Sequence, residues 1–125
     1  MINKRVMIVD DESDVNLVIK MVLEESGFQV DSFTDPLLAL ENVKLEADKY
    51  MLLVLDIRMP NMNGFELYRE IKKIDDKVKV CFITAYDVFY EKLKEGFPAV
   101  NVGCFIKKPV DINELVSRIN RELKE

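Results

Sequence analysis

Short apolar runs alternate with amphipathic segments along the whole chain. Four of these runs are rich in β-branched or aromatic residues, and each predicts a strand that is buried on both faces. They span residues 5–9, 51–55, 78–83 and 103–106. A fifth segment, 28–33, alternates apolar and polar residues and predicts an edge strand.

The segments between these runs carry apolar residues at helical spacing. Four of them predict helices, which begin near Asp14, at Pro36, after Gly64 and at Asp111. Gly27 is placed to end the first helix, Asp35 caps the second, and Glu114 is the expected capping-box partner in the last. A short, poorly patterned helix is expected around 87–95. Strands that alternate with helices in this way predict a parallel sheet covered on both faces.

The composition predicts one soluble globular domain, residues 1–125, and disfavours several classes of function. Hydrophobic residues make up 49% and charged residues 33% of the chain. The net charge of −5 argues against a nucleic-acid-binding surface. No apolar run approaches the ~18 residues that a membrane span needs. The chain has no histidine, which excludes histidine-based acid–base catalysis and the commonest transition-metal ligand.

The two cysteines bear on the cellular compartment. Cys81 and Cys104 lie in apolar runs, so we expect small buried thiols in preference to a disulfide. Acidic residues come too early in the N-terminal segment for a signal peptide. Together these features favour a reducing, cytoplasmic compartment.

Polar side chains follow four of the predicted strands, at the edge of the sheet where parallel α/β folds place their functional crevice. They are Asp10, Asp11 and Glu12 after the first strand, Asp56 after the third, Thr84 after the fourth, and Lys107 and Lys108, followed by Pro109, after the fifth. Carboxylates that converge there repel one another unless a cation lies among them, and oxygen ligands suit Mg²⁺. Lys108 supplies a point charge for a carboxylate or a phosphoryl oxygen, and Thr84 supplies a hydroxyl donor.

Each of these residues also has an ordinary structural interpretation. Taken alone, Asp10 and Asp11 would be solvated residues that cap the following helix, and only Asp56 opposite them favours a cation site. Thr84 alone could simply end a strand. Lys107 and Lys108 could both be surface lysines.

Four motifs, in order and each at a strand end, resemble the receiver domain of two-component response regulators. They are VDDE (9–12), LDIRMPNMNG (55–64), TA (84–85) and KP (108–109), and the resemblance covers essentially the whole chain. It implies a flavodoxin-like (βα)5 fold, a doubly wound parallel five-stranded sheet with the order 2-1-3-4-5.

The resemblance also implies a chemistry. Asp56 would be the phosphoacceptor, which takes a phosphoryl group from a sensor histidine kinase or a histidine phosphotransfer protein. Asp10, Asp11 and Asp56 would hold Mg²⁺, with the backbone carbonyl of Arg58 as a further ligand. The domain would then be no enzyme in the usual sense, because it catalyses only its own phosphorylation and dephosphorylation.

Further residues acquire roles in switching by the same resemblance. Thr84 would be the switch hydroxyl and Lys108, which directly precedes proline, the essential lysine. Phe105 matches the aromatic switch position, with an ordinary core phenylalanine as the alternative. Arg58 and Tyr86 would shield the phosphoryl group from water and so lengthen its lifetime, with exposed solubilising residues as the alternative.

One segment departs from the family pattern. In residues 87–103, Pro98 interrupts the chain and Asn101 stands where glycine is expected, so the fourth helix should be short, shifted or irregular. The Lys108–Pro109 bond is a candidate for the cis form.

Four alternatives for the whole chain differ in setting or in chemistry. The chain could act alone through a protein partner, or it could be the receiver of a longer regulator with an output domain; neither contacts nucleic acid or membrane through this domain. A phosphatase of the aspartyl-phosphate type is disfavoured because Ile57 and Arg58 follow Asp56 instead of the second aspartate of that motif. A degenerate receiver would lack a site residue, and none is missing.

Overall fold

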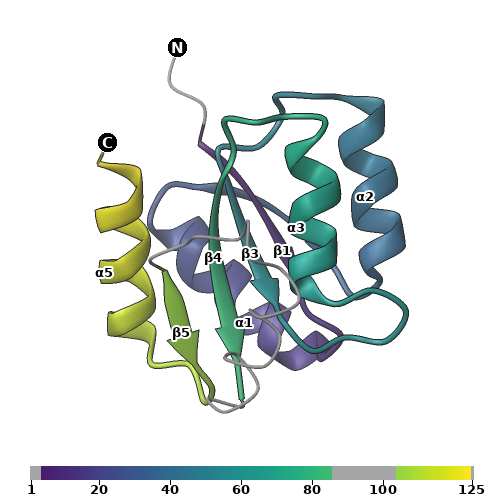
Figure 1. Ribbon diagram of the computed structural model, residues 1–125. Helices are drawn as coiled ribbons and strands as arrows, with labels where there is room; N and C mark the ends of the chain where they lie inside the picture. The colour runs from purple at the N-terminus through teal and green to yellow at the C-terminus, as the bar shows by residue number, and fades with distance from the viewer. Residues whose placement is uncertain (1–3, 86–103, 125) are drawn as a thin grey trace.

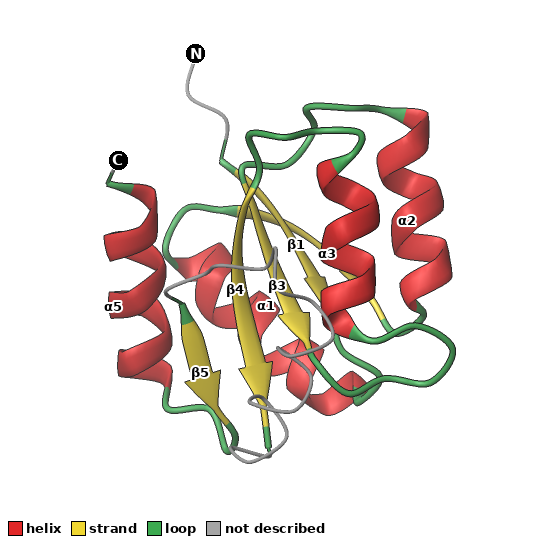
Figure 2. Cartoon of the chain, in the orientation of Figure 1, coloured by secondary structure: helices red, strands yellow, loops and turns green. Residues whose placement is uncertain are grey.

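Five parallel strands form one sheet in the computed structural model, which describes residues 4–85 and 104–124 (Figure 1). The strands are β1 (Arg5–Val9), β2 (Gln29–Phe33), β3 (Leu52–Asp56), β4 (Lys79–Thr84) and β5 (Phe105–Lys107). Their order is β2-β1-β3-β4-β5, so the predicted order 2-1-3-4-5 and the flavodoxin-like fold are confirmed. Every strand pair is parallel, which brings the carboxyl ends of the strands to one edge; the labelled arrowheads in Figure 2 point toward it. We call this the carboxyl edge.

Four helices in the described residues cover the two faces of the sheet. They are α1 (Ser13–Glu25), α2 (Pro36–Leu45), α3 (Gly64–Lys72) and α5 (Ile112–Leu123). The helices α2 and α3 pack on one face, and α1 and α5 pack on the other (Figure 1). No helix in the described ranges is long and apolar enough to cross a membrane.

The helix starts follow from local capping. The carboxylate of Asp35 accepts the N–H of Leu37, with proline at the first helical position. The carboxylate of Asp111 accepts the N–H of Glu114 at 3.0 Å, the first half of the predicted capping box. Helix α3 begins with a full capping box that was not predicted from the sequence, in which the side chains of Asn63 and Glu66 each accept the other's backbone N–H.

The strands read as continuous apolar runs because helices bury both of their faces. In β1, for example, Val6–Val9 have no exposed surface. β1 spans the predicted run 5–9, whereas β3 and β4 lie one residue later than the predicted runs 51–55 and 78–83. Asp56 and Thr84 are therefore the last residues of β3 and β4 and do not follow them. Both side chains are consequently held by the sheet itself, not by a loop.

The two cysteines form a disulfide, so the prediction of two buried thiols is wrong. Cys81 in β4 and Cys104 just before β5 have Cα atoms 4.6 Å apart, because Phe82 pairs with Phe105 in adjacent strands. Both side chains are buried in the core under α1 and α5. The sequence does not contain this strand register. The expected reducing compartment therefore no longer has free thiols to support it.

The remaining local predictions have mixed outcomes. The Lys108–Pro109 bond is cis, as expected for an X-Pro bond in a tight turn. Gly27 ends α1 with a positive φ of 97°, a conformation that favours glycine. Tyr86, the helix expected around 87–95 and the irregular segment 87–103 lie outside the described residues.

Candidate functional site

Three carboxylates converge at the carboxyl edge. Asp10 follows β1 and Asp56 ends β3, and these strands are neighbours with Val9 beside Leu55. Asp10, Asp11 and Asp56 each offer an oxygen, and all three oxygens lie within 4.8 Å of one another. Asp10 is fully buried and Asp56 is 4% exposed, whereas Asp11 faces solvent.

Backbone contacts hold the first of these carboxylates in place. The N–H of Glu12 donates to Asp10 Oδ1 at 2.8 Å, and the N–H of Asp10 donates to the carbonyl of Phe33. The buried side chain of Asn16 donates from one amide nitrogen to the carbonyls of Asp10 and Phe33, at 2.9 and 3.0 Å. Asn16 thus ties the ends of β1 and β2 to α1.

The sequence analysis missed Asn16, although its signal is visible. It lies on the helical face that also carries Ile19 and Leu23, so it is a polar residue at a core position. A polar side chain at such a position needs a specific partner.

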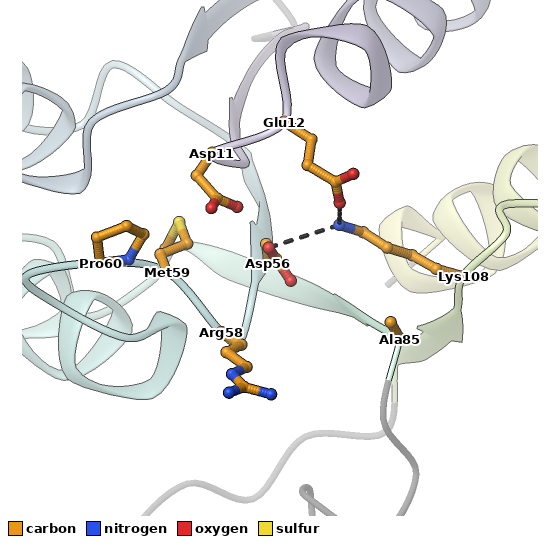
Figure 3. Close-up of a pocket in the computed structure, with 8 residues that line it drawn as sticks. All are labelled: Asp11, Glu12, Asp56, Arg58, Met59, Pro60, Ala85 and Lys108. Atoms are coloured by element: carbon orange, nitrogen blue, oxygen red, sulfur yellow. Dashed lines mark hydrogen bonds and ion pairs between the residues drawn. The ribbon is translucent and has the colours of Figure 1, made fainter.

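The lysine after β5 completes the cluster (Figure 3). Lys108 Nζ lies 2.8 Å from Asp10 Oδ2, 2.8 Å from Glu12 Oε1 and 3.5 Å from Asp56 Oδ2. The backbone N–H of Lys108 donates to the carbonyl of Thr84, which extends the pairing of β5 with β4 up to the site. Lys107 has an exposed side chain, so Lys108 is the lysine that reaches the carboxylates.

The cluster carries more negative than positive charge, because several carboxylates surround the single ammonium group of Lys108. Burial and then the charge of Asp10 raise the pKa of Asp56 from 3.8 to about 7, although Lys108 opposes the shift. Burial also raises the pKa of Asp10. Burial alone would lower the pKa of Lys108, but its hydrogen bonds to Asp10 and Glu12 raise it above the ordinary value. A further cation would therefore be stabilised here.

The loop after β3 turns back tightly toward the site. The N–H of Gly64 donates to the carbonyl of Ile57 at 2.8 Å. A Cβ atom at Gly64 would collide with the backbone carbonyl oxygen of Asp56. Only glycine fits this approach without displacing the backbone. Asn61, with a φ of 72°, completes the turn in the left-handed region.

A pocket of about 470 Å³ opens above the carboxylates (Figure 3). Its lining comes from the ends of four strands (β1, β3, β4 and β5) and the loop after β3, and comprises Asp11, Glu12, Asp56, Arg58, Met59, Pro60, Ala85 and Lys108. Its size is within the range of small-ligand sites. The donor set of three carboxylates, without nitrogen or sulfur ligands among them, fits a hard cation such as Mg²⁺.

Two further predicted residues do not line this pocket. Thr84 is buried at the end of β4, one position beyond the residue that pairs with Asp56. Phe105 is partly buried in β5 and stacks on Phe82, with ring centroids 5.5 Å apart. In this structure Phe105 thus packs as a core residue of the α2–α3 face.

Comparisons with known proteins agree on one family. The family model for the response regulator receiver domain matches residues 6–120. The response regulator receiver protein CpdR of Brucella abortus is 31% identical over 96% of the chain and 97% of its own length. The transcriptional regulatory protein YvrH of Bacillus subtilis is 38% identical over 98% of the chain, which spans 50% of that protein.

Solved structures give the same result. A CheY-like response regulator receiver domain from Methanospirillum hungatei superimposes with a TM-score of 0.81 and is 28% identical. The superposition covers 96% of the chain and 93% of that structure.

Proposed function

Because the chain belongs to the response regulator receiver domain family, we propose that Asp56 accepts a phosphoryl group and so switches the domain between two signalling states. The phosphoryl donor is a phosphohistidine on a sensor histidine kinase or a histidine phosphotransfer protein. The observation that carries this proposal is a nearly buried carboxylate, Asp56, beneath an open pocket and 3.5 Å from the ammonium group of Lys108.

The transfer step follows from this arrangement. One carboxylate oxygen of Asp56 attacks phosphorus, the new O–P bond forms, and the P–N bond to the donor histidine breaks. The bonding electrons leave on the imidazole, which takes up a proton. Lys108 lies where its charge stabilises the phosphoryl oxygens as the transfer proceeds.

Asp10, Asp11 and Asp56 would hold Mg²⁺, with the backbone carbonyl of Arg58 as a fourth protein ligand. The bound ion supplies positive charge that neutralises the transferring group. It would also favour the ionised form of Asp56, which the attack requires and which burial disfavours.

The change of state would begin at the strand ends beside Asp56. Thr84 would turn its hydroxyl toward the new phosphoryl oxygens, and Phe105 would repack inward. Arg58 lines the pocket and, with Tyr86, would hinder the water that hydrolyses the acyl phosphate. In this proposal the domain catalyses only its own phosphorylation and dephosphorylation.

The wider setting is also part of the proposal. The chain is a signalling domain of a two-component system, and relatives such as YvrH are about twice its length. We place residues 1–125 in one receiver domain in the cytoplasm, which signals to a downstream protein or to a fused output domain. The domain itself contacts neither nucleic acid nor membrane, consistent with its net charge of −5.

The test is phosphorylation by acetyl phosphate, followed by intact-mass spectrometry. In this reaction the P–O bond of the donor breaks and acetate leaves. We expect one added phosphoryl group in the presence of Mg²⁺, and none with a chelator or in Asp56→Asn. Asp76→Asn, which changes an exposed aspartate, is the matched control and should behave as the wild type. Equal labelling of Asp56→Asn and the control would refute the assignment.

A further inference from the structure

The amino group of Lys108 has two carboxylate partners that lie closer than the proposed phosphoacceptor. Asp10 and Glu12 are both 2.8 Å away, whereas Asp56 is 3.5 Å away. The close partners differ in environment, because Asp10 is fully buried and the side chain of Glu12 is 63% exposed. The contact with Glu12 is therefore the one that an incoming anion can replace most easily.

Glu12 stands at the N-cap of α1 but does not cap the helix with its side chain. Its carbonyl accepts the N–H groups of Val15 and Asn16, and its carboxylate makes no capping hydrogen bond. In the other helices of the described residues, the N-cap side chains accept backbone N–H groups; these are Asp35, Asn63 and Asp111. The carboxylate of Glu12 instead reaches Lys108 across the site (Figure 3). An N-cap side chain that makes no capping hydrogen bond, and contacts a residue elsewhere instead, indicates a role other than starting the helix.

The ion pair also lies at the boundary of two cavities. Glu12, Ala85 and Lys108 line both the pocket above Asp56 and an adjoining groove of about 540 Å³. A phosphoryl group over Asp56 would contact the same ammonium group, whose two short contacts go to Asp10 and Glu12.

We propose that Glu12 is a positioning residue that restrains Lys108 at the mouth of the pocket in the unphosphorylated protein. Asp10 anchors the lysine in both states, and Lys108 exchanges Glu12 for a phosphoryl oxygen when Asp56 is modified. This inference rests on the proposed function and adds a restraint that slows phosphorylation of Asp56. The effect is small, because an exposed ion pair changes an equilibrium by about twofold to fivefold.

The test compares Glu12→Gln with Asp14→Asn. Glutamine keeps the size of the side chain and removes its charge. Asp14→Asn removes the same charge from an exposed position two residues away, in the first turn of α1. Glu12→Asp is a third variant, which keeps the charge but is one methylene too short for the observed contact. We would measure the initial rate of phosphorylation by acetyl phosphate at saturating Mg²⁺. Calorimetry would give the affinities for Mg²⁺ alone and for beryllofluoride, a phosphoryl mimic, in its presence.

We expect Glu12→Gln and Glu12→Asp to be phosphorylated about threefold faster than the wild type and to bind beryllofluoride about threefold more tightly. Asp14→Asn should match the wild type in both, and any change in Mg²⁺ affinity from lost charge should be similar in Glu12→Gln and Asp14→Asn. Unchanged or slower phosphorylation of the Glu12 variants, or an equal gain in Asp14→Asn, would overturn the inference. Failure of the wild type to be phosphorylated would instead reject the proposed function.

Discussion

Replacement of Asp56 by asparagine should stabilise the metal-free protein, by an amount that grows with pH. Asp56 is 4% exposed, and its pKa is raised from 3.8 in the unfolded chain to about 7 in the folded one. At pH values between these two pKa values, the folded state keeps a proton on Asp56 that the unfolded chain has lost. The free energy of unfolding therefore falls as the pH rises up to and through the folded pKa. Asparagine cannot ionise, so the free energy of unfolding of Asp56→Asn does not fall with pH in this way.

The size of the effect follows from the shift in pKa. A shift from 3.8 to about 7 corresponds to at most about 4 kcal/mol once the carboxylate is fully ionised. Relaxation of the neighbouring carboxylates and of Lys108 reduces this, so we expect a gain of roughly 1 to 4 kcal/mol at about pH 8 and almost none below about pH 4.

The assay is urea unfolding followed by circular dichroism, in a chelator, across this range of pH. The chain has no tryptophan, so fluorescence is a weaker probe. Asp76→Asn is the control, because it removes an exposed carboxylate outside the cluster. Addition of Mg²⁺ should stabilise the wild type more than Asp56→Asn, and the difference between their free energies of unfolding should therefore become smaller. An equal gain at low and high pH, or a destabilised Asp56→Asn at about pH 8, would contradict the account.

Three further results are expected. Asp11→Asn should raise the melting temperature in the absence of metal, because it removes repulsion between the carboxylates of the cluster. It should also reduce the further rise that millimolar Mg²⁺ produces. Wild-type melting curves that coincide with and without Mg²⁺ would exclude a cation site. Gly64→Ala should lower the free energy of unfolding by about 2 kcal/mol or more in urea, because its Cβ would displace the backbone of Asp56, and a neutral result would contradict the observed approach. Protein refolded with Cys81 and Cys104 reduced should have a free energy of unfolding lower by about 3 kcal/mol, since the disulfide closes a loop with a sequence separation of 23. Oxidised and reduced forms of equal stability in urea would disprove the crosslink.

The sheet could be predicted from the sequence because its strands are apolar throughout. Continuous runs such as 5–9 and 51–55 occur where helices cover both faces, and that pattern specifies a parallel arrangement. The strand order came from the family resemblance. The ends of β3 and β4 were predicted one residue too early, because Asp56 and Thr84 continue the ladder although their side chains are polar.

The features that the sequence did not reveal depend on contacts between distant segments. The disulfide needs the register of β4 against β5, and the two cysteines are separated by 23 positions. The role of Asn16 depends on two carbonyls at the ends of different strands. The contact between Glu12 and Lys108 spans 96 positions, and the sequence analysis placed both residues at strand ends without pairing them.

The most direct test of the central claim is to map the phosphorylated residue itself. Wild-type protein would be treated with acetyl phosphate and Mg²⁺, and borohydride would then reduce the acyl phosphate to a homoserine that tandem mass spectrometry locates. The account predicts homoserine at position 56 and unmodified aspartate at positions 10 and 11. Homoserine at another aspartate, or none in a folded sample with Mg²⁺, would contradict it.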